Sequence, residues 1–118
     1  MSFFDENSSG VITDHVAWHG RLNRFMSELF LHAHKPKTYI LWHSRQKSYY
    51  FFSHVVDVFT ISHTLFLLDP ANLFWKYTYQ EIIYQHKDID QLLRSIMQTY
   101  GNGDWQPIVH PSKKPIYF

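Results

Sequence analysis

Residues 38–48 read TYILWHSRQKS and join two kinds of chemistry in one short stretch. The first part, 38–42, is an apolar run rich in β-forming residues on both faces, which is typical of a central strand. The second part, 44–48, holds hydroxyls, cations and an amide, which are groups that can bind an anion. We therefore predict a strand that ends in an anion-binding loop, with Trp42 at the junction.

Three further strands are expected after this one, over residues 48–54, 58–68 and 73–79. The strand over 58–68 alternates for most of its length, so His63 and Thr64 should lie on opposite faces. The gaps between the predicted strands are too short for helical crossovers. The strands are therefore expected to form an antiparallel meander.

Two helices are predicted on either side of these strands in the chain. The first begins after Asn23, a good N-cap, and must stop before Pro36. The second begins after Asp88 and ends at Gly101, with an apolar stripe at helical spacing. The stripe consists of Ile89, Leu92, Leu93, Ile96 and Met97.

The chain of 118 residues is long enough for one domain with its own core. Residues 1–12 include DENSSG, which is typical of turns and linkers, and are predicted to form a flexible tail. Residues 13–118 are expected to form the single domain. Its predicted fold class is α+β, with a central antiparallel β-sheet flanked by two α-helices.

Composition argues against several functional classes. The net charge of +1 gives no reason to expect a nucleic acid as partner. The longest apolar region, 49–68, is interrupted by His54, Asp57 and His63, so we expect strands there and no membrane span. The absence of cysteine removes disulfides and thiolate sites, and it fits a reducing compartment such as the cytoplasm. The first ten residues lack the pattern of a signal peptide.

The order of elements resembles that of a Src-homology-2 domain, and four segments carry the resemblance. The family's opening Trp-aromatic-His-Gly-basic-aliphatic-x-Arg segment looks like AWHGRLNR at 17–24, without the leading Trp. Its central strand, Gly-Thr-Phe-Leu-Val-Arg-Glu-Ser, looks like KTYILWHS at 37–44. Its next strand looks like YYFFSH at 49–54, and its second helix like DIDQLLRSI at 88–96. The similarity covers roughly residues 16–100.

This resemblance implies a non-catalytic module that binds phosphotyrosine in an extended peptide. By position, Arg24 of the first helix would lie over the tyrosine ring and the phosphate. His63 would lie near the ring in one strand register, whereas Val58 takes that position in the other. Each charge-assisted bond to the phosphate contributes about 1.5–3 kcal/mol. The loop donors are expected to be Ser44, Arg45, Lys47 and Ser48, and the candidate pocket residues are Trp42, His43 and His63.

Trp42 departs from the family pattern, because it stands where the family has a buried Arg that binds the phosphate. Tryptophan has one N–H and no charge, and losing such an Arg costs about 2–5 kcal/mol. Three outcomes stay open. Arg24, Arg45 and Lys47 could hold phosphate in a shallower site. Alternatively, Trp42 could fill the pocket of a domain that binds unphosphorylated partners, or the domain could be purely structural.

Other kinds of site find weaker support in the residues. His15 and His19 have helical spacing, but no carboxylate completes a metal set, so we expect neither a metal nor a cofactor. There is no nucleophile elbow, glycine-rich phosphate loop or carboxylate pair, so we expect no enzyme. Single-stranded RNA binding through tyrosine and phenylalanine rings stays an alternative, although a basic stripe is lacking.

The resemblance also implies a tyrosine-phosphorylated protein or peptide as partner, and we expect a cytoplasmic monomer. The family reads the residues after the phosphotyrosine with the segments that flank the second helix, here 77–87 and 100–107. One hypothesis for the divergent composition is an origin outside animals, for example as an effector that an intracellular bacterium delivers into the host cytosol.

Overall fold

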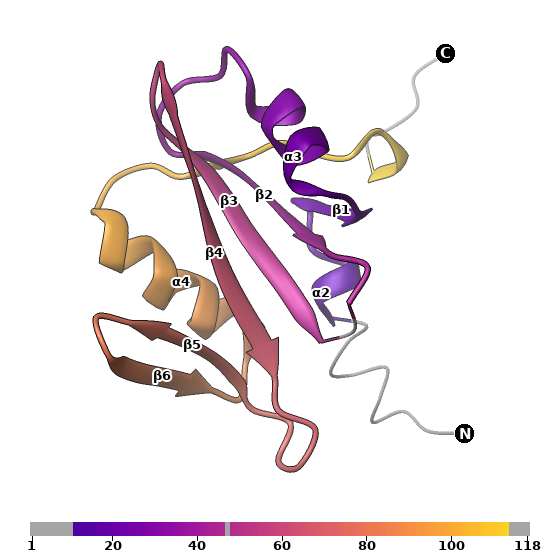
Figure 1. The fold of residues 1–118 in the computed structure, drawn as a ribbon, viewed down its shortest axis with the longest axis vertical. Helices are drawn as coiled ribbons and strands as arrows, with labels where there is room; N and C mark the ends of the chain where they lie inside the picture. Colours follow the sequence, from indigo (N-terminus) through magenta and orange to yellow (C-terminus); the bar gives the residue numbers. More distant parts are fainter. Residues whose placement is uncertain (1–10, 47, 114–118) are drawn as a thin grey trace.

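The computed structural model describes residues 11–46 and 48–113 and has one sheet with a helix on each side (Figure 1). In chain order, the elements are α2 (Val11–Thr13), β1 (Trp18–Arg21), α3 (Arg24–Leu31), β2 (Thr38–His43), β3 (Tyr49–Asp57), β4 (Thr60–Leu68), β5 (Trp75–Tyr79), β6 (Ile82–His86), α4 (Ile89–Tyr100), β7 (Gln106–Pro107) and the 3₁₀ turn η2 (Pro111–Lys113).

The sheet is mostly antiparallel. Its strand order is β1-β2-β3-β4-β5-β6, and β7 also pairs with β2. The pairs from β2 to β6 are antiparallel, whereas β1 and β7 run parallel to β2. The parallel β1 pair is possible because α3 forms the long crossover that such a connection needs. The predicted α+β class, a central antiparallel β-sheet flanked by two α-helices, is confirmed.

Both long helices begin at the predicted caps. The Asn23 side chain accepts a hydrogen bond from the Met26 N–H at 2.8 Å, which satisfies an orphan donor of the first turn. Asp88 caps α4, and Gly101 ends it with a φ of 131° while its N–H donates to the Met97 carbonyl. A positive φ of this kind favours glycine.

The sheet buries both of its faces, but to different extents. On the α3 side, Leu31, Ile40, Trp42 and Val55 form a small core. The α4 side carries a larger core that extends to α2 and β1. Its buried members are Ile12, Ala17, Tyr39, Leu41, Phe52, Phe66, Trp75, Tyr77, Ile89, Leu92, Leu93 and Ile96. Strand β2 contributes to both cores, as its apolar character on both faces predicts.

The predicted tail over 1–12 extends too far into the chain. Residues 11 and 12 belong to α2, and Ile12 is fully buried in the α4-side core. The polar stretch DENSSG ends before this residue. Burial of the large apolar side chain of Ile12 stabilises the segment that carries it. Residues 1–10 lie outside the described part of the chain.

Strand β6 was not predicted. It pairs with β5 through a two-residue turn in which both Gln80 and Glu81 have positive φ, at 50° and 68°. Hairpin turns of this kind usually contain Asn or Gly, so the sequence carried no turn signal here.

In the described part of the chain, no helix is long and apolar enough to cross a bilayer.

Candidate functional site

Trp42 lies in the core beneath α3, where the resemblance had placed a binding pocket. Its side chain is 3% exposed, and its ring stacks on Phe51 with centroids 4.3 Å apart. The indole N–H donates to the Ser53 hydroxyl at 2.8 Å. Trp42 therefore fills the floor of this region and does not present a donor to solvent. Its core neighbours are Leu31, Ile40 and Val55.

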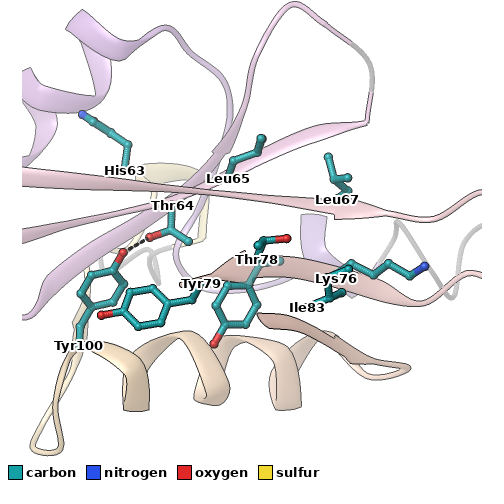
Figure 2. Close-up of a pocket in the computed structure, with 10 residues that line it drawn as sticks. His63, Thr64, Leu65, Leu67, Lys76, Thr78, Tyr79, Ile83 and Tyr100 are labelled. Atoms are coloured by element: carbon teal, nitrogen blue, oxygen red, sulfur yellow. Dashed lines mark hydrogen bonds between the residues drawn. The ribbon is translucent and has the colours of Figure 1, made fainter. Parts of the chain in front are cut away.

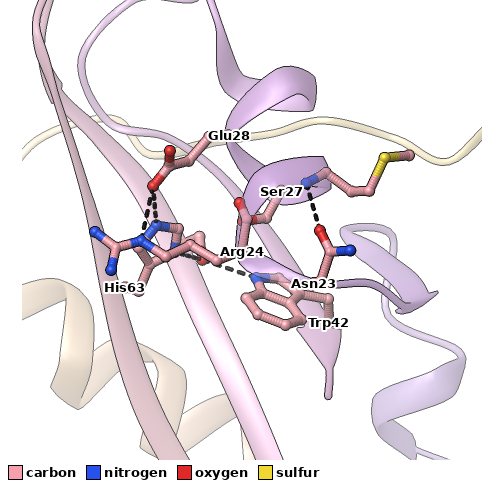
Figure 3. Close-up of polar contacts among 8 residues, drawn as sticks. Asn23, Arg24, Ser27, Glu28, Trp42 and His63 are labelled. Carbon is pink, nitrogen blue, oxygen red and sulfur yellow. Dashed lines mark hydrogen bonds and ion pairs between the residues drawn. The ribbon is translucent and has the colours of Figure 1, made fainter. Parts of the chain in front are cut away.

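A chain of polar contacts leads from Trp42 to the surface (Figure 3). The Ser53 hydroxyl and His63 Nδ1 are 2.7 Å apart, and His63 Nε2 is 2.8 Å from Glu28 Oε2. The same carboxylate oxygen accepts a bond from Arg24 Nε at 3.1 Å. Because the indole only donates, the simplest pattern has Ser53 donating to Nδ1 and His63 donating from Nε2 to Glu28.

The first turn of α3 places the two charged residues of this network. The Asn23 cap fixes the start of the helix, so Arg24 and Glu28 lie four residues apart on one face. Ser27 is fully buried and its hydroxyl donates to the Arg24 carbonyl at 2.7 Å. A small, internally bonded side chain at this position lets α3 approach the sheet, which brings Glu28 within reach of His63.

The network becomes more exposed toward α3. The side chain of His63 is 13% exposed, that of Glu28 is 38% exposed and that of Arg24 is 77% exposed. The hydrogen bonds from His63 and then from Arg24 hold the pKa of the Glu28 carboxyl below its ordinary value. Arg24 and His63 thus converge on one anionic oxygen at the edge of the domain. We call Arg24, Glu28, Ser53 and His63 the α3-side site.

The connectivity of Ser53, His63 and Glu28 matches that of a hydrolytic triad, but the serine is inaccessible. Ser53 is fully buried, and its hydroxyl already receives the Trp42 N–H. A nucleophile must reach the substrate carbonyl, which this position prevents. The three residues therefore orient one another. The described residues contain no group of three or more His, Asp or Glu side chains placed to hold a metal ion.

The predicted anion loop is a tight turn that bonds largely to itself. The Ser44 hydroxyl accepts the Gln46 N–H at 3.1 Å, and the side chain of Arg45 is exposed. Ser48 is also exposed and has a positive φ of 71°. Lys47 lies outside the described residues. The loop thus presents Arg45 and Ser48 to solvent.

Within the described residues, this loop and the α3-side site are not bonded to each other. Among the described contacts, no hydrogen bond or ion pair joins Ser44, Arg45 or Ser48 to Arg24 or His63.

His43 is held by stacking at the end of β2. Its ring stacks on Trp18 with centroids 5.4 Å apart, and its Nδ1 is 3.0 Å from the Ser44 carbonyl oxygen. These contacts place His43 next to the loop on the edge of the sheet where β1 pairs. It packs against Trp18 and has no described contact with His63.

A groove of about 410 Å³ lies on the other side of β4, between β4, the β5–β6 hairpin and the end of α4 (Figure 2). Thr64 points toward α4, where its hydroxyl lies 2.9 Å from the Tyr100 hydroxyl. His63, its neighbour in sequence, points the opposite way toward α3, as the alternation predicted. The lining residues are His63, Thr64, Leu65, Leu67, Lys76, Tyr77, Thr78, Tyr79, Ile83 and Tyr100.

The two segments that flank α4 have different roles. The first, 77–87, includes most of the β5–β6 hairpin and supplies Tyr77, Tyr79 and Ile83 to the wall of the groove. In the second, 100–107, only Tyr100 lines the groove, whereas the Trp105 ring packs edge-on against Phe52 of the core. The groove is therefore built mainly by the hairpin.

Strand β4 lies between the groove and the α3 residues of the α3-side site, His63 belongs to both, and part of one edge of the strand is free. Strand β5 pairs with β4 only at Leu67 and Leu68. In the described ranges 11–46 and 48–113, residues 60–66 pair with β3 alone. A free strand edge of this kind can take an extended peptide.

Two members of the α3-side site, Glu28 and Ser53, were not predicted. Glu28 had a usable signal, since it follows Arg24 by four residues on a predicted helix. Ser53 had none, because its place depends on the strand register that sets it opposite His63. Trp42 was predicted at the junction of strand and loop, and the structure shows that it belongs to the core.

Comparisons with known proteins support the fold. No protein-family model and no curated protein matches the chain. The structure is similar to the solution structure of the VAV1 SH2 domain complexed with a tyrosine-phosphorylated peptide from SLP76. The TM-score is 0.62 at 14% sequence identity, over 91% of this chain and 80% of that chain. At this identity the likeness shows the fold alone, so the chain has a Src-homology-2-like fold.

Proposed function

We propose that this chain is a non-catalytic module that binds tyrosine-phosphorylated peptides, laid in extended form across β4. The observation that carries the proposal is the pair of sites on either side of β4. One side has Arg24 and His63 converging on an anion, and the other has the largely apolar groove of about 410 Å³. An extended peptide alternates its side chains and can use an anchor on each side of a strand.

In this proposal the phosphate is held near the surface. Arg24 supplies an exposed guanidinium that can lie over an aromatic ring, and His63 supplies an N–H fixed by Ser53. Ser44, Arg45, Lys47 and Ser48 stay candidates for further donors, as does His43. Because Trp42 fills the floor, no buried Arg forks onto the phosphate, and affinity is expected to be lower by about 2–5 kcal/mol than with such an Arg.

A second candidate function is binding of unphosphorylated peptides. Glu28 favours it, because its carboxylate occupies the α3-side site and can accept a hydrogen bond from a neutral tyrosine hydroxyl. A phosphate dianion would be repelled by the same carboxylate. Binding of a neutral tyrosine requires no donor beyond Arg24 and His63, which already contact Glu28.

RNA binding receives no support from Phe51 and Phe52, two of the aromatic residues that suggested it, whereas Tyr49 of the same stretch is exposed. Phe51 stacks on Trp42, and Phe52 is fully buried with its ring 5.0 Å from that of Tyr39. Rings packed in this way have no free face for a base. The monomeric state, the cytoplasmic location and the bacterial origin stay predictions.

The test is a titration with a phosphotyrosine peptide library and its unphosphorylated twin. We expect at least tenfold tighter binding of the phosphorylated form, because a charge-assisted bond to Arg24 contributes about that factor. Arg24→Ala should remove the difference, whereas Arg94→Ala, an exposed Arg on α4, should keep it. Equal affinity for both forms would favour the second candidate, and binding of neither would overturn both.

A further inference from the structure

We propose that Glu28 is a resident competitor in the α3-side site. Its carboxylate occupies the position that a ligand phosphate would take and must leave before phosphate binds. Glu28 then determines how strongly the site discriminates between phosphorylated and unphosphorylated tyrosine. The inference rests on the proposed function, because it concerns the specificity of the same site.

The contacts of Glu28 are those expected of a bound ligand. One carboxylate oxygen, Oε2, receives both His63 Nε2 at 2.8 Å and Arg24 Nε at 3.1 Å. Within the described residues, the other carboxylate oxygen makes no hydrogen bond. Two nitrogen donors that converge on one oxygen form the arrangement that a phosphate oxygen also requires.

The receiving side of the site is rigid, whereas the carboxylate is free to move. His63 is fixed through Ser53 to the buried Trp42, so its Nε2 keeps its direction when Glu28 leaves. Glu28 stands on the exposed face of α3 with 38% of its side chain accessible. It can therefore rotate into solvent without unpacking the core.

Charge makes the two possible occupants exclusive. His63 and Arg24 hold the pKa of the Glu28 carboxyl below its ordinary value, so the group is an anion at neutral pH. A phosphate bound to His63 would lie within a few ångströms of this anion, and like charges at that distance repel. A neutral tyrosine hydroxyl has no such conflict, because it can donate to Glu28.

The experiment compares Glu28→Gln with wild type, using the phosphotyrosine library and its unphosphorylated twin. The amide keeps the size of the side chain and removes its charge. We expect about tenfold tighter binding of the phosphorylated library. The affinity for the twin should not increase, because a neutral amide oxygen is a weaker acceptor for the tyrosine hydroxyl than the carboxylate. Asp14→Asn is the matched control, because it removes one negative charge from an exposed position that follows α2, and it should change affinity by less than about twofold.

A second measurement tests this inference independently of the proposed function. Phenyl phosphate is titrated while the ring nitrogen resonances of His63 are followed by NMR. In Glu28→Gln the resonances should shift at lower phenyl phosphate concentration than in wild type, by about tenfold. This result would support the competitor even if no phosphopeptide binds and the proposed function fails.

Two outcomes would overturn the inference. One is an unchanged or weaker affinity of Glu28→Gln for the phosphorylated library while wild type binds it. The other is a His63 ring that phenyl phosphate does not affect in Glu28→Gln. Glu28→Ala serves as a second variant that removes the side chain, and circular dichroism checks that both variants keep the fold.

Discussion

The two faces of the sheet are filled in different ways. The α4 face buries twelve residues in one large core, which reaches from α2 to α4. Among the described residues, the apolar core on the α3 face has four buried members, and beyond them a polar chain runs from the buried Ser53 to the exposed Arg24. Apolar area removed from water is the main source of stability, whereas oriented polar groups serve recognition. The α4 face thus stabilises the domain, and the α3 face positions a site.

Two histidines make the same contrast at the level of single side chains. His63 on the α3 face has a partner for each ring nitrogen. His54 on the α4 face is 3% exposed and packs on the rings of Tyr100 and Trp105, at 4.6 and 5.1 Å. Its Nδ1 has no hydrogen-bond partner among the described residues. One histidine is therefore held by polar bonds and the other by apolar packing.

The largest predicted effect tests whether the core on the α4 face contributes most of the stability of the domain. Phe52→Ala empties a fully buried position in the large core and should lower the free energy of unfolding by about 3–5 kcal/mol. Urea denaturation measures this change. Phe59→Ala is the matched control, since Phe59 is 96% exposed at the β3–β4 turn and should cost less than about 0.5 kcal/mol. Similar losses for the two variants would contradict the assignment.

A second prediction concerns the pH dependence of stability. Burial, and then the charge of His63, lower the pKa of His54 from 6.5 to about 4. The unfolded chain therefore binds the proton more readily. The contribution of neutral His54 to the free energy of unfolding is therefore complete above pH 6.5. It is lost as the pH falls from 6.5 toward 4, by up to about 1.4 kcal/mol per pH unit.

The measurement is urea denaturation at pH 5 and pH 7.5. His54→Phe should reduce the difference between the two pH values, because an aromatic ring fits the site without titrating. His15 and His19 should keep part of the slope, since burial lowers the pKa of each. An unchanged slope in His54→Phe would show that His54 is solvated.

The smallest predicted effect tests whether Trp42 of the core is coupled to His63 of the α3-side site. Trp42→Phe keeps an aromatic ring against Phe51 but removes the N–H that Ser53 accepts at 2.8 Å. We expect a loss of about 1–2 kcal/mol in the free energy of unfolding. The NMR signals of the His63 ring should also change, because Ser53 loses one of the bonds that orient it. A stability loss without any change at His63 would mean that the polar chain is not connected.

Much of this fold could be predicted from local patterns. Asn23 and Asp88 marked the helix starts because caps act on neighbouring residues, and the continuous apolar run of β2 indicated a strand buried on both faces. The β5–β6 hairpin was missed because Gln80 and Glu81 adopt positive φ without being Asn or Gly. Ile12 was missed because one buried residue next to a polar segment has no periodicity.

For the candidate site, the resemblance indicated Arg24 and His63, and the structure brings both onto Glu28. Within the described part of the chain, the loop residues make no hydrogen bond or ion pair with them. The difference lies in how far apart in the sequence the interacting residues are. A helix face can be read from spacings of three or four residues, but the meeting of a loop with a helix depends on the packing of both against the sheet.

The sequence by itself determined the two long helices, strands β2 to β5, their order and hence the α+β class, because these follow from periodicity, caps and short connections. Only the tertiary structure decided that Trp42 belongs to the core and that a carboxylate lies in the α3-side site. Ser53 faces His63 through the register of β3 and β4, and Glu28 reaches His63 across 35 residues of sequence. Contacts of this kind arise when α3 packs on the sheet, and no local pattern encodes them.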